Sequence, residues 1–306
     1  MSVAPQVRPL PDPELVQRFA GFAVRSRLPL EGGFSGTHRG LHRGAGMEFA
    51  EYRRYAPGDD VTRLDWRVLG RSDRLYVKES EADTDLVTRL VLDASGSMGY
   101  GSGAGSKLEA ACQVAAVLTV LLLQQGDGVG LTGVGGTPAT EIAPRRAPAQ
   151  AGVVCHALRQ LQAAGEVDLA TALEGLAPRL RRRGLILVFS DAFGAADRLA
   201  SRLGLLARHG HDVTLFEVTD PDEETFPFAG TGRFEDLEGG PACTVDAGAL
   251  APAYRRCLEA HRQQLRAACA EQGVRLLPLR TDEGAAATLS RFLGAGRRPG
   301  ARGGSP

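Results

Sequence analysis

The chain lacks a charge imbalance and a cysteine framework. Its 36 basic residues balance its 36 acidic residues, so the net charge gives no reason to expect a nucleic acid or an anionic membrane as a partner. The five cysteines are scattered and form no Cys-x-x-Cys pair. This pattern indicates reduced thiols rather than disulfides.

Segments that would direct the chain to a membrane are also missing from the pattern. The first twenty residues lack a basic start followed by an apolar core, which a secretory signal would have. The longest apolar run covers residues 114–123 and includes Thr119, and a run of this length is too short to cross a bilayer. We therefore expect a soluble, cytoplasmic protein without membrane insertion.

What the sequence does have, from about Thr84 onward, is a regular alternation of short apolar segments with longer helical ones. This alternation predicts an α/β fold with a doubly wound, mostly parallel sheet sandwiched by helices. We expect an N-terminal extension (1–83), the α/β domain (84–293) and a disordered tail (294–306) that is rich in Gly, Arg and Pro.

Apolar periodicity and turn residues give the expected elements of the domain. The expected strands cover residues 87–92, 130–133, 185–189, 213–218 and 274–278, with a hairpin at 234–236 and 243–245. The expected helices cover residues 107–124, 152–162, 169–181, 197–208, 251–271 and 283–293. In the extension, the sequence predicts a helix over 11–22 and a strand over 75–79.

The first of these strands leads directly into an Asp-x-Ser-x-Ser sequence formed by Asp93, Ser95 and Ser97. One carboxylate and two hydroxyls on a tight loop offer three hard oxygens, which suit Mg²⁺ or Mn²⁺. The arrangement resembles the metal-ion-dependent adhesion site of von Willebrand factor A domains. Asp191, which ends another buried strand, is the candidate for the second acidic ligand. The alternative is that these residues only cap the loops and helices that follow.

The third element of such a site, a threonine hydroxyl from a loop ahead of a helix, is missing. Val167 stands at that position, and valine has the shape of threonine without its oxygen. Asp168 and Thr171 lie nearby and could supply oxygens from unmatched positions. The sequence therefore predicts weak metal binding that Val167→Thr would strengthen.

A second string of residues lies ahead of the metal loop, in Phe49–Trp66, followed by Arg71 and Val77–Glu79. Its Arg-x-Tyr-x-Pro-Gly-Asp-Asp…Arg-x-x-Asp-Trp pattern resembles the signature of the bacterial domain-of-unknown-function family fifty-eight. The resemblance implies a von Willebrand A-like domain in the second part of the chain. Read from the residues alone, the paired Arg and Asp side chains form an internal network of ion pairs, or a surface that docks a partner.

The resemblance also implies a function without catalysis. In a site of this type a partner's Asp or Glu completes the metal shell, and the family implies a MoxR-type AAA+ ATPase as partner, with this chain as adaptor or assembly factor. One alternative is a metal-dependent hydrolase using Asp93 and Asp191, although no nucleophile is paired with a base. The other is a metal-free scaffold that binds partners through the Arg/Asp segment.

Overall fold

The computed structural model describes most of the chain. The described residues are 9–27, 48–54, 76–81, 86–103, 105–180 and 183–294. The chain separates into two compact units, one formed by Met1–Leu28 together with Val87–Pro306 and the other by Pro29–Leu86. These units group the first 28 residues with the α/β domain, whereas the sequence pattern placed them with the extension.

In the smaller unit the described residues form one two-stranded sheet. Strand β1 (Glu48–Arg54) pairs antiparallel with β2 (Tyr76–Glu81), and β2 corresponds to the strand expected from the alternating pattern. The centre of the Arg/Asp segment, with Trp66, lies outside the described residues, as does the tail beyond Gly294.

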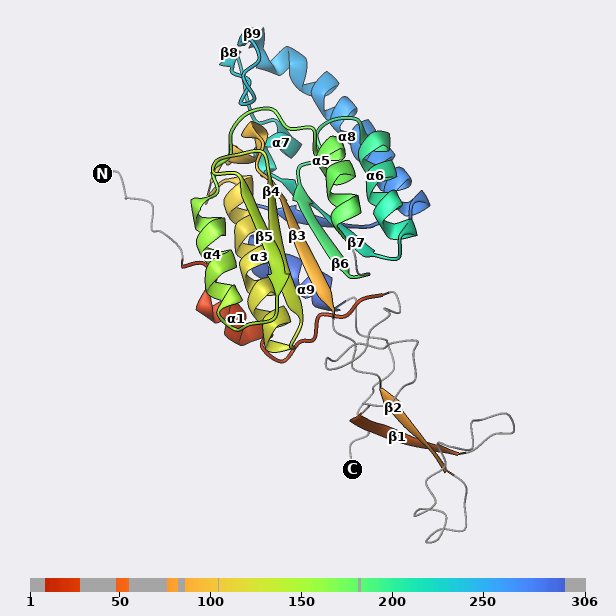
Figure 1. Ribbon diagram of the computed structural model, residues 1–306. Coiled ribbons are helices and arrows are strands. Elements are labelled where there is room, and N and C mark those ends of the chain that lie inside the picture. The colour runs from red at the N-terminus through yellow and green to blue at the C-terminus, as the bar shows by residue number, and fades with distance from the viewer. Residues whose placement is uncertain are drawn as a thin grey trace, which may run out of the picture. The chain divides into compact units, whose positions relative to one another are not determined.

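The larger unit is built on a six-stranded sheet of order β10-β7-β6-β3-β4-β5 (Figure 1). Neighbouring strands are parallel except for β4 and β5, which are antiparallel. The strands are β3 (Val87–Asp93), β4 (Gly128–Val134), β5 (Thr140–Arg145), β6 (Leu185–Ser190), β7 (Asp212–Thr219) and β10 (Arg275–Arg280). The mostly parallel α/β sheet expected from the sequence is confirmed.

Helices cover both faces of this sheet and complete a three-layer sandwich (Figure 1). On one face α3 contacts α1, α4 and α9, and on the other α6 contacts α5 and α8. Their bounds are α1 (Pro13–Phe19), α3 (Lys107–Gln124), α4 (Gln150–Gln160), α5 (Leu169–Leu176), α6 (Ala196–Arg208), α8 (Ala247–Glu271) and α9 (Gly284–Gly294).

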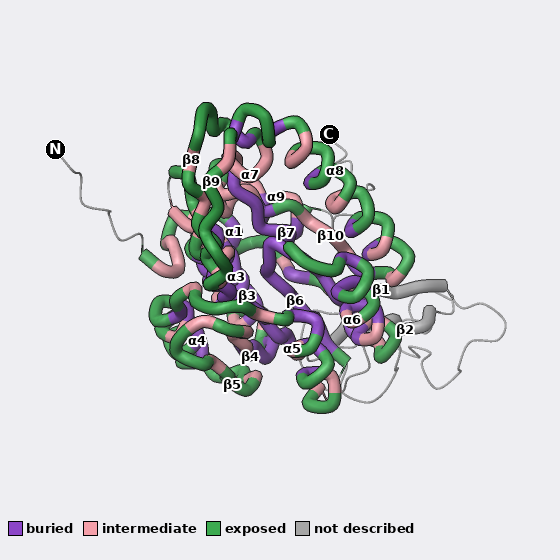
Figure 2. Tube along the Cα trace, turned by 90° about the horizontal axis from the view of Figure 1, so that it is seen from above, coloured by how far each residue is buried: buried purple, intermediate pink, exposed green. Residues whose placement is uncertain are grey.

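The core lies between these layers. Strands β3, β6 and β7 are buried almost throughout, as Figure 2 shows, because helices cover both of their faces. Strands in that position carry continuous apolar sequences rather than alternating ones. Phe189 of β6 and Phe216 of β7 stack with their ring centroids 4.5 Å apart, which ties these two neighbouring strands together.

Helix α3 is a long, apolar helix of the core. Ser106 and Glu109 form a capping box at its start, each side chain bonding the other's backbone N–H. By length and composition α3 could cross a membrane, alone among the described helices, but 67% of it is buried inside the fold. Core packing therefore accounts for its apolar surface.

Several short elements differ from the sequence expectation or were missing from it. Strand β5 and the five-residue helix α7 (Pro221–Thr225) were not expected, and the expected helix over 169–181 ends as α5 followed by a 3₁₀ turn, η3 (Ala177–Arg179). A second 3₁₀ turn, η2 (Gly96–Gly99), follows β3. The expected hairpin is present as β8 (Thr231–Phe234) and β9 (Cys243–Asp246).

Candidate functional site

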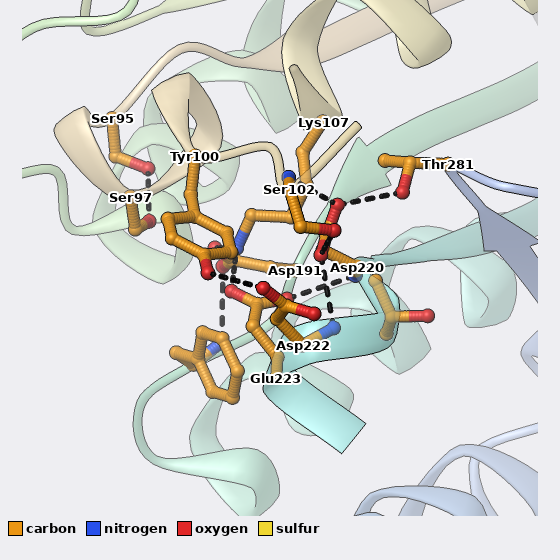
Figure 3. A network of polar contacts seen from close by, with 12 residues as sticks. Ser95, Ser97, Tyr100, Ser102, Lys107, Asp191, Asp220, Asp222, Glu223 and Thr281 are labelled. Carbon is orange, nitrogen blue, oxygen red and sulfur yellow. Dashed lines mark hydrogen bonds and ion pairs between the residues drawn. The ribbon is translucent and has the colours of Figure 1, made fainter. Parts of the chain in front are cut away.

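The carboxyl ends of β3, β6 and β7 lie at one edge of the sheet because these strands are parallel neighbours. We call this the carboxyl edge. Asp93 ends β3, Asp191 follows β6 and Asp220 follows β7. Ligand sites of open α/β sheets form at this edge. The two carboxylates predicted from the sequence, Asp93 and Asp191, therefore share the edge with Asp220, which was not predicted. Figure 3 shows Asp191 and Asp220.

The side chains of the Asp-x-Ser-x-Ser loop bond mainly to the protein itself. Asp93 accepts the Ser95 backbone N–H at Oδ1 (2.9 Å) and the Ser190 hydroxyl at Oδ2 (2.6 Å). The hydroxyls of Ser95 and Ser97 lie 3.1 Å apart. Burial raises the pKa of Asp93, hydrogen bonds from Ser190 and Ser95 oppose the rise, and the charge of Asp191 adds to it. Each carboxylate oxygen of Asp93 thus already accepts one hydrogen bond from the protein.

Asp191 is bound by a lysine. The ammonium of Lys107, in the first turn of α3, donates to Asp191 Oδ2 at 2.7 Å and to Glu223 Oε1 of α7 at 2.5 Å. The Lys107 side chain is 0% exposed, and its Nζ lies 5.0 Å from the ring centroid of Phe193. Burial raises the pKa of Glu223, and the charge of Lys107 opposes that rise. A compact positive charge therefore already lies against the second candidate ligand.

Asp168 and Thr171 serve a different purpose from the one considered in the sequence. Asp168 caps α5 by accepting the backbone N–H and the hydroxyl of Thr171, and these bonds lower its pKa. Arg198 of α6 donates to both side chains, and both residues are exposed. Their oxygens are engaged in a surface link between α5 and α6.

Val167 packs against the turn that follows β4. It is partly exposed, and a Cβ added to Gly135, in the turn after β4, would collide with Val167 Cγ2. Gly135 has φ +74°, a conformation that glycine adopts without strain. The valine therefore presents methyl groups to the turn beside the Asp-x-Ser-x-Ser loop.

These residues do not fit a divalent metal shell as they stand. Mg²⁺ requires oxygen ligands in near-octahedral geometry, but each oxygen of Asp93 already accepts a hydrogen bond, Val167 has no oxygen and Asp191 binds an ammonium. Within the described part of the chain, no group of three or more His, Cys, Asp or Glu side chains is arranged to hold a metal. Binding of Mg²⁺ or Mn²⁺ remains a prediction, and the donor chemistry does not support it.

Asp220 also lies at the carboxyl edge, and the sequence did not predict it as a site residue. It is fully buried and accepts the Ser102 backbone N–H (3.1 Å), the Ser102 hydroxyl (2.5 Å), the Thr281 hydroxyl (2.8 Å) and the Asp222 backbone N–H (3.0 Å). It thereby joins the loop before α3, the start of α7 and the end of β10 (Figure 3). The signal was present in the sequence as a capping box with proline at the first helical position.

The turn after β6 places an aromatic ring at the surface. Ala192 has φ +56°, a left-handed conformation that is uncommon outside glycine. Its N–H donates to the Ser190 hydroxyl (3.0 Å), and its carbonyl lies 3.0 Å from His261 Nε2. The next residue, Phe193, is 46% exposed. A turn held in a strained conformation thus presents a rigidly placed ring at the carboxyl edge.

The comparison with protein families decides the assignment. The model of the family described as "Protein of unknown function DUF58" matches residues 51–266. The chain belongs to the DUF58 family. Uncharacterized proteins of Mycobacterium tuberculosis and Mycobacterium bovis are each 32% identical to this DUF58 chain over 292 residues, which cover 94% of this chain and 91% of theirs. The resemblance noted in the sequence is confirmed.

Solved structures similar to the DUF58 chain include an aerotolerance-related membrane protein from Bacteroides fragilis, with 17% identity, a TM-score of 0.43, and coverage of 69% of this chain and 97% of that one. The von Willebrand A domain of SpRpn10 has 12% identity and a TM-score of 0.41, covering 68% and 95%. The first description contradicts the cytoplasmic location expected from the sequence, and we withdraw that expectation.

Proposed function

We propose that this DUF58 chain is a protein-interaction module that docks its partner at the carboxyl edge of the sheet, with Phe193 as the central contact. The supporting observation is the strained turn at Ala192, which holds a large apolar ring outward. Strain of about 1–3 kcal/mol at a single residue is typical of functional sites. Aromatic side chains held rigidly at a surface are also the usual hot spots of interfaces.

A second exposed apolar side chain lies beside the Asp-x-Ser-x-Ser loop. Leu237, in the loop between β8 and β9, is 52% exposed, and a Cβ on Gly96 would collide with its carbonyl oxygen. The β8–β9 loop therefore lies directly against η2, beside the Asp-x-Ser-x-Ser loop. We propose that Phe193 and Leu237 supply apolar contacts to the partner and that polar residues of α7 lie at the rim, as in many interfaces.

The resemblance gives the first partner to test, a MoxR-type AAA+ ATPase, for which this chain would act as an adaptor or assembly factor. We propose direct docking that needs no metal. A metal-bridged mode, in which the partner supplies an Asp or Glu, is the alternative. Hydrolysis by Asp93 and Asp191 is less favoured, since each oxygen of the first accepts a hydrogen bond from the protein and the second is held in an ion pair with Lys107.

The test is calorimetric titration of the chain with the MoxR-type ATPase of its own host. We expect Phe193→Ala to weaken binding by about 2 kcal/mol, roughly 30-fold, as at interface hot spots. Val153→Ala is the matched control, because Val153 is 50% exposed on α4 and lies outside the carboxyl edge. Equal binding by the two variants would remove Phe193 from the interface.

Repeating the titration with Mg²⁺ and with a chelator separates the two docking modes. Direct docking predicts equal affinity in both, whereas loss of binding in chelator would favour the metal-bridged mode. Turnover of a phosphate ester or ATP by the isolated chain, abolished by Asp93→Asn, would instead support the hydrolase.

A further inference from the structure

Lysine is rare in this chain. Of the 36 basic residues, only Lys78 and Lys107 are lysines and the rest are arginines. Lys107 is also among the largest side chains that are fully buried. Lysine carries its charge on a compact ammonium, whereas the guanidinium of arginine is a broad planar fork. The cation buried at this position is therefore a compact one.

At the location of Lys107 a positive charge destabilises the fold unless negative groups compensate it. Lys107 is the first residue of α3, where the helix dipole favours negative rather than positive groups. The ammonium is also withdrawn from water, since the side chain is 0% exposed. Two carboxylates from separate elements, Asp191 after β6 and Glu223 in α7, provide the compensation at 2.7 and 2.5 Å.

The same ammonium is closed off from outside. The ring of Phe193 lies over it, with 5.0 Å from Nζ to the ring centroid, a distance at which a cation is attracted to the face of the ring. Figure 3 shows Lys107 pointing between Asp191 and Glu223. A partner's carboxylate would therefore not reach this charge as it would reach the open position of a bound metal.

We propose that the Lys107 ammonium takes the place of the divalent cation at the carboxyl edge, so that the wild-type edge is assembled without metal. In a von Willebrand A-type site, a metal ion would neutralise the carboxylates that gather at the strand ends. Here a side chain neutralises Asp191 and simultaneously holds α7 through Glu223. The inference concerns the cation site alone and goes beyond the proposed docking, because it holds whichever partner binds.

A gain-of-function experiment tests the proposal. Lys107→Ala removes the ammonium and leaves the carboxylates of Asp191 and Glu223 around the vacated space. We expect Mn²⁺ to bind this variant with 1:1 stoichiometry by calorimetry and to raise its melting temperature by several degrees, while the wild type shows neither effect at millimolar Mn²⁺. Lys107→Met is the matched control, because methionine fills the space without charge and should gain no Mn²⁺ binding.

Two further variants make the result decisive. The double variant Lys107→Ala/Asp191→Asn should lose the gained Mn²⁺ binding, which assigns the ion to this position. A folded Lys107→Ala that ignores Mn²⁺ would overturn the proposal. If Lys107→Ala does not fold, the wild type decides: saturable Mn²⁺ binding that Asp93→Asn abolishes would overturn the proposal, and absence of binding supports it. None of these measurements uses the partner, so they are independent of the docking test.

Discussion

Removing the Asp220 carboxylate should destabilise the protein far more than removing its neighbour. Asp220 is fully buried and accepts four hydrogen bonds, and bonds to a charged acceptor each contribute about 1.5–3 kcal/mol. Their sum is not additive, because the freed donors find partial replacements. Since breaking a buried hydrogen-bond network is among the most destabilising single changes, we expect a loss of about 3–4 kcal/mol for Asp220→Ala. With a typical m value, the urea midpoint should fall by roughly 1.5 M.

Asp222→Ala is the control for this measurement. Asp222 is partly exposed and its side chain accepts one long hydrogen bond, 3.4 Å from the Tyr100 hydroxyl, so its loss should cost less than about 1 kcal/mol. Urea unfolding of both variants, followed by circular dichroism, measures the difference. Equal destabilisation would refute the assignment of Asp220 as the residue that joins the three segments.

The pH dependence provides a second check on Asp220. Burial alone would raise its pKa, but hydrogen bonds from Ser102, the Asp222 backbone and Thr281 lower it below the ordinary value of 3.8. A lowered pKa means that the folded state favours the ionised form, so its stabilisation is complete above that ordinary value and is lost as the pH falls towards the folded pKa. The gap in stability between wild type and Asp220→Ala should therefore be constant near neutral pH and narrow below about pH 4.

Two further predictions concern the metal loop and the thiols. Val167→Thr should not gain affinity for Mg²⁺ or Mn²⁺ while Lys107 remains. Calorimetric titration should therefore show no binding by the wild type or by the variant. Tighter binding by the variant would instead support a degraded metal site. At pH 8, Ellman's reagent should react quickly with the exposed Cys243 and Cys257. Cys112 should react only after unfolding, because burial raises the pKa of its thiol to about 12. A rapid reaction of Cys112 in the folded protein would contradict this and show that α3 separates from the core.

The buried elements of the fold were predictable, because their sequences are dictated by the layers that cover them. The range of α3 was predicted to the residue, and β3 and β6 each differ by one residue at one end. Strand β5 escaped because it is a polar edge strand whose residues are alternately half-buried and exposed, with Pro144 inside it. Helix α7 escaped because five residues are too few for a helical period to appear.

The candidate site was predictable only in part. The carboxylates at the strand ends could be placed at one edge, since parallel strands bring all their carboxyl ends to the same edge of the sheet. The partner of Asp191 could not be found this way, because Lys107 lies 84 residues away in sequence. Pairings between distant segments depend on tertiary packing, which no local pattern encodes.

The two outer strands of the six-stranded sheet share a feature with consequences for solubility. Strand β5 contains Pro144 and strand β10 contains Pro278, and these strands form the two edges. Proline has no backbone N–H, so each edge lacks a donor that an incoming strand would need. Open sheet edges are templates for aggregation and domain swapping. Both borders of this sheet are therefore poor templates, which should keep concentrated chains from joining edge to edge while they fold.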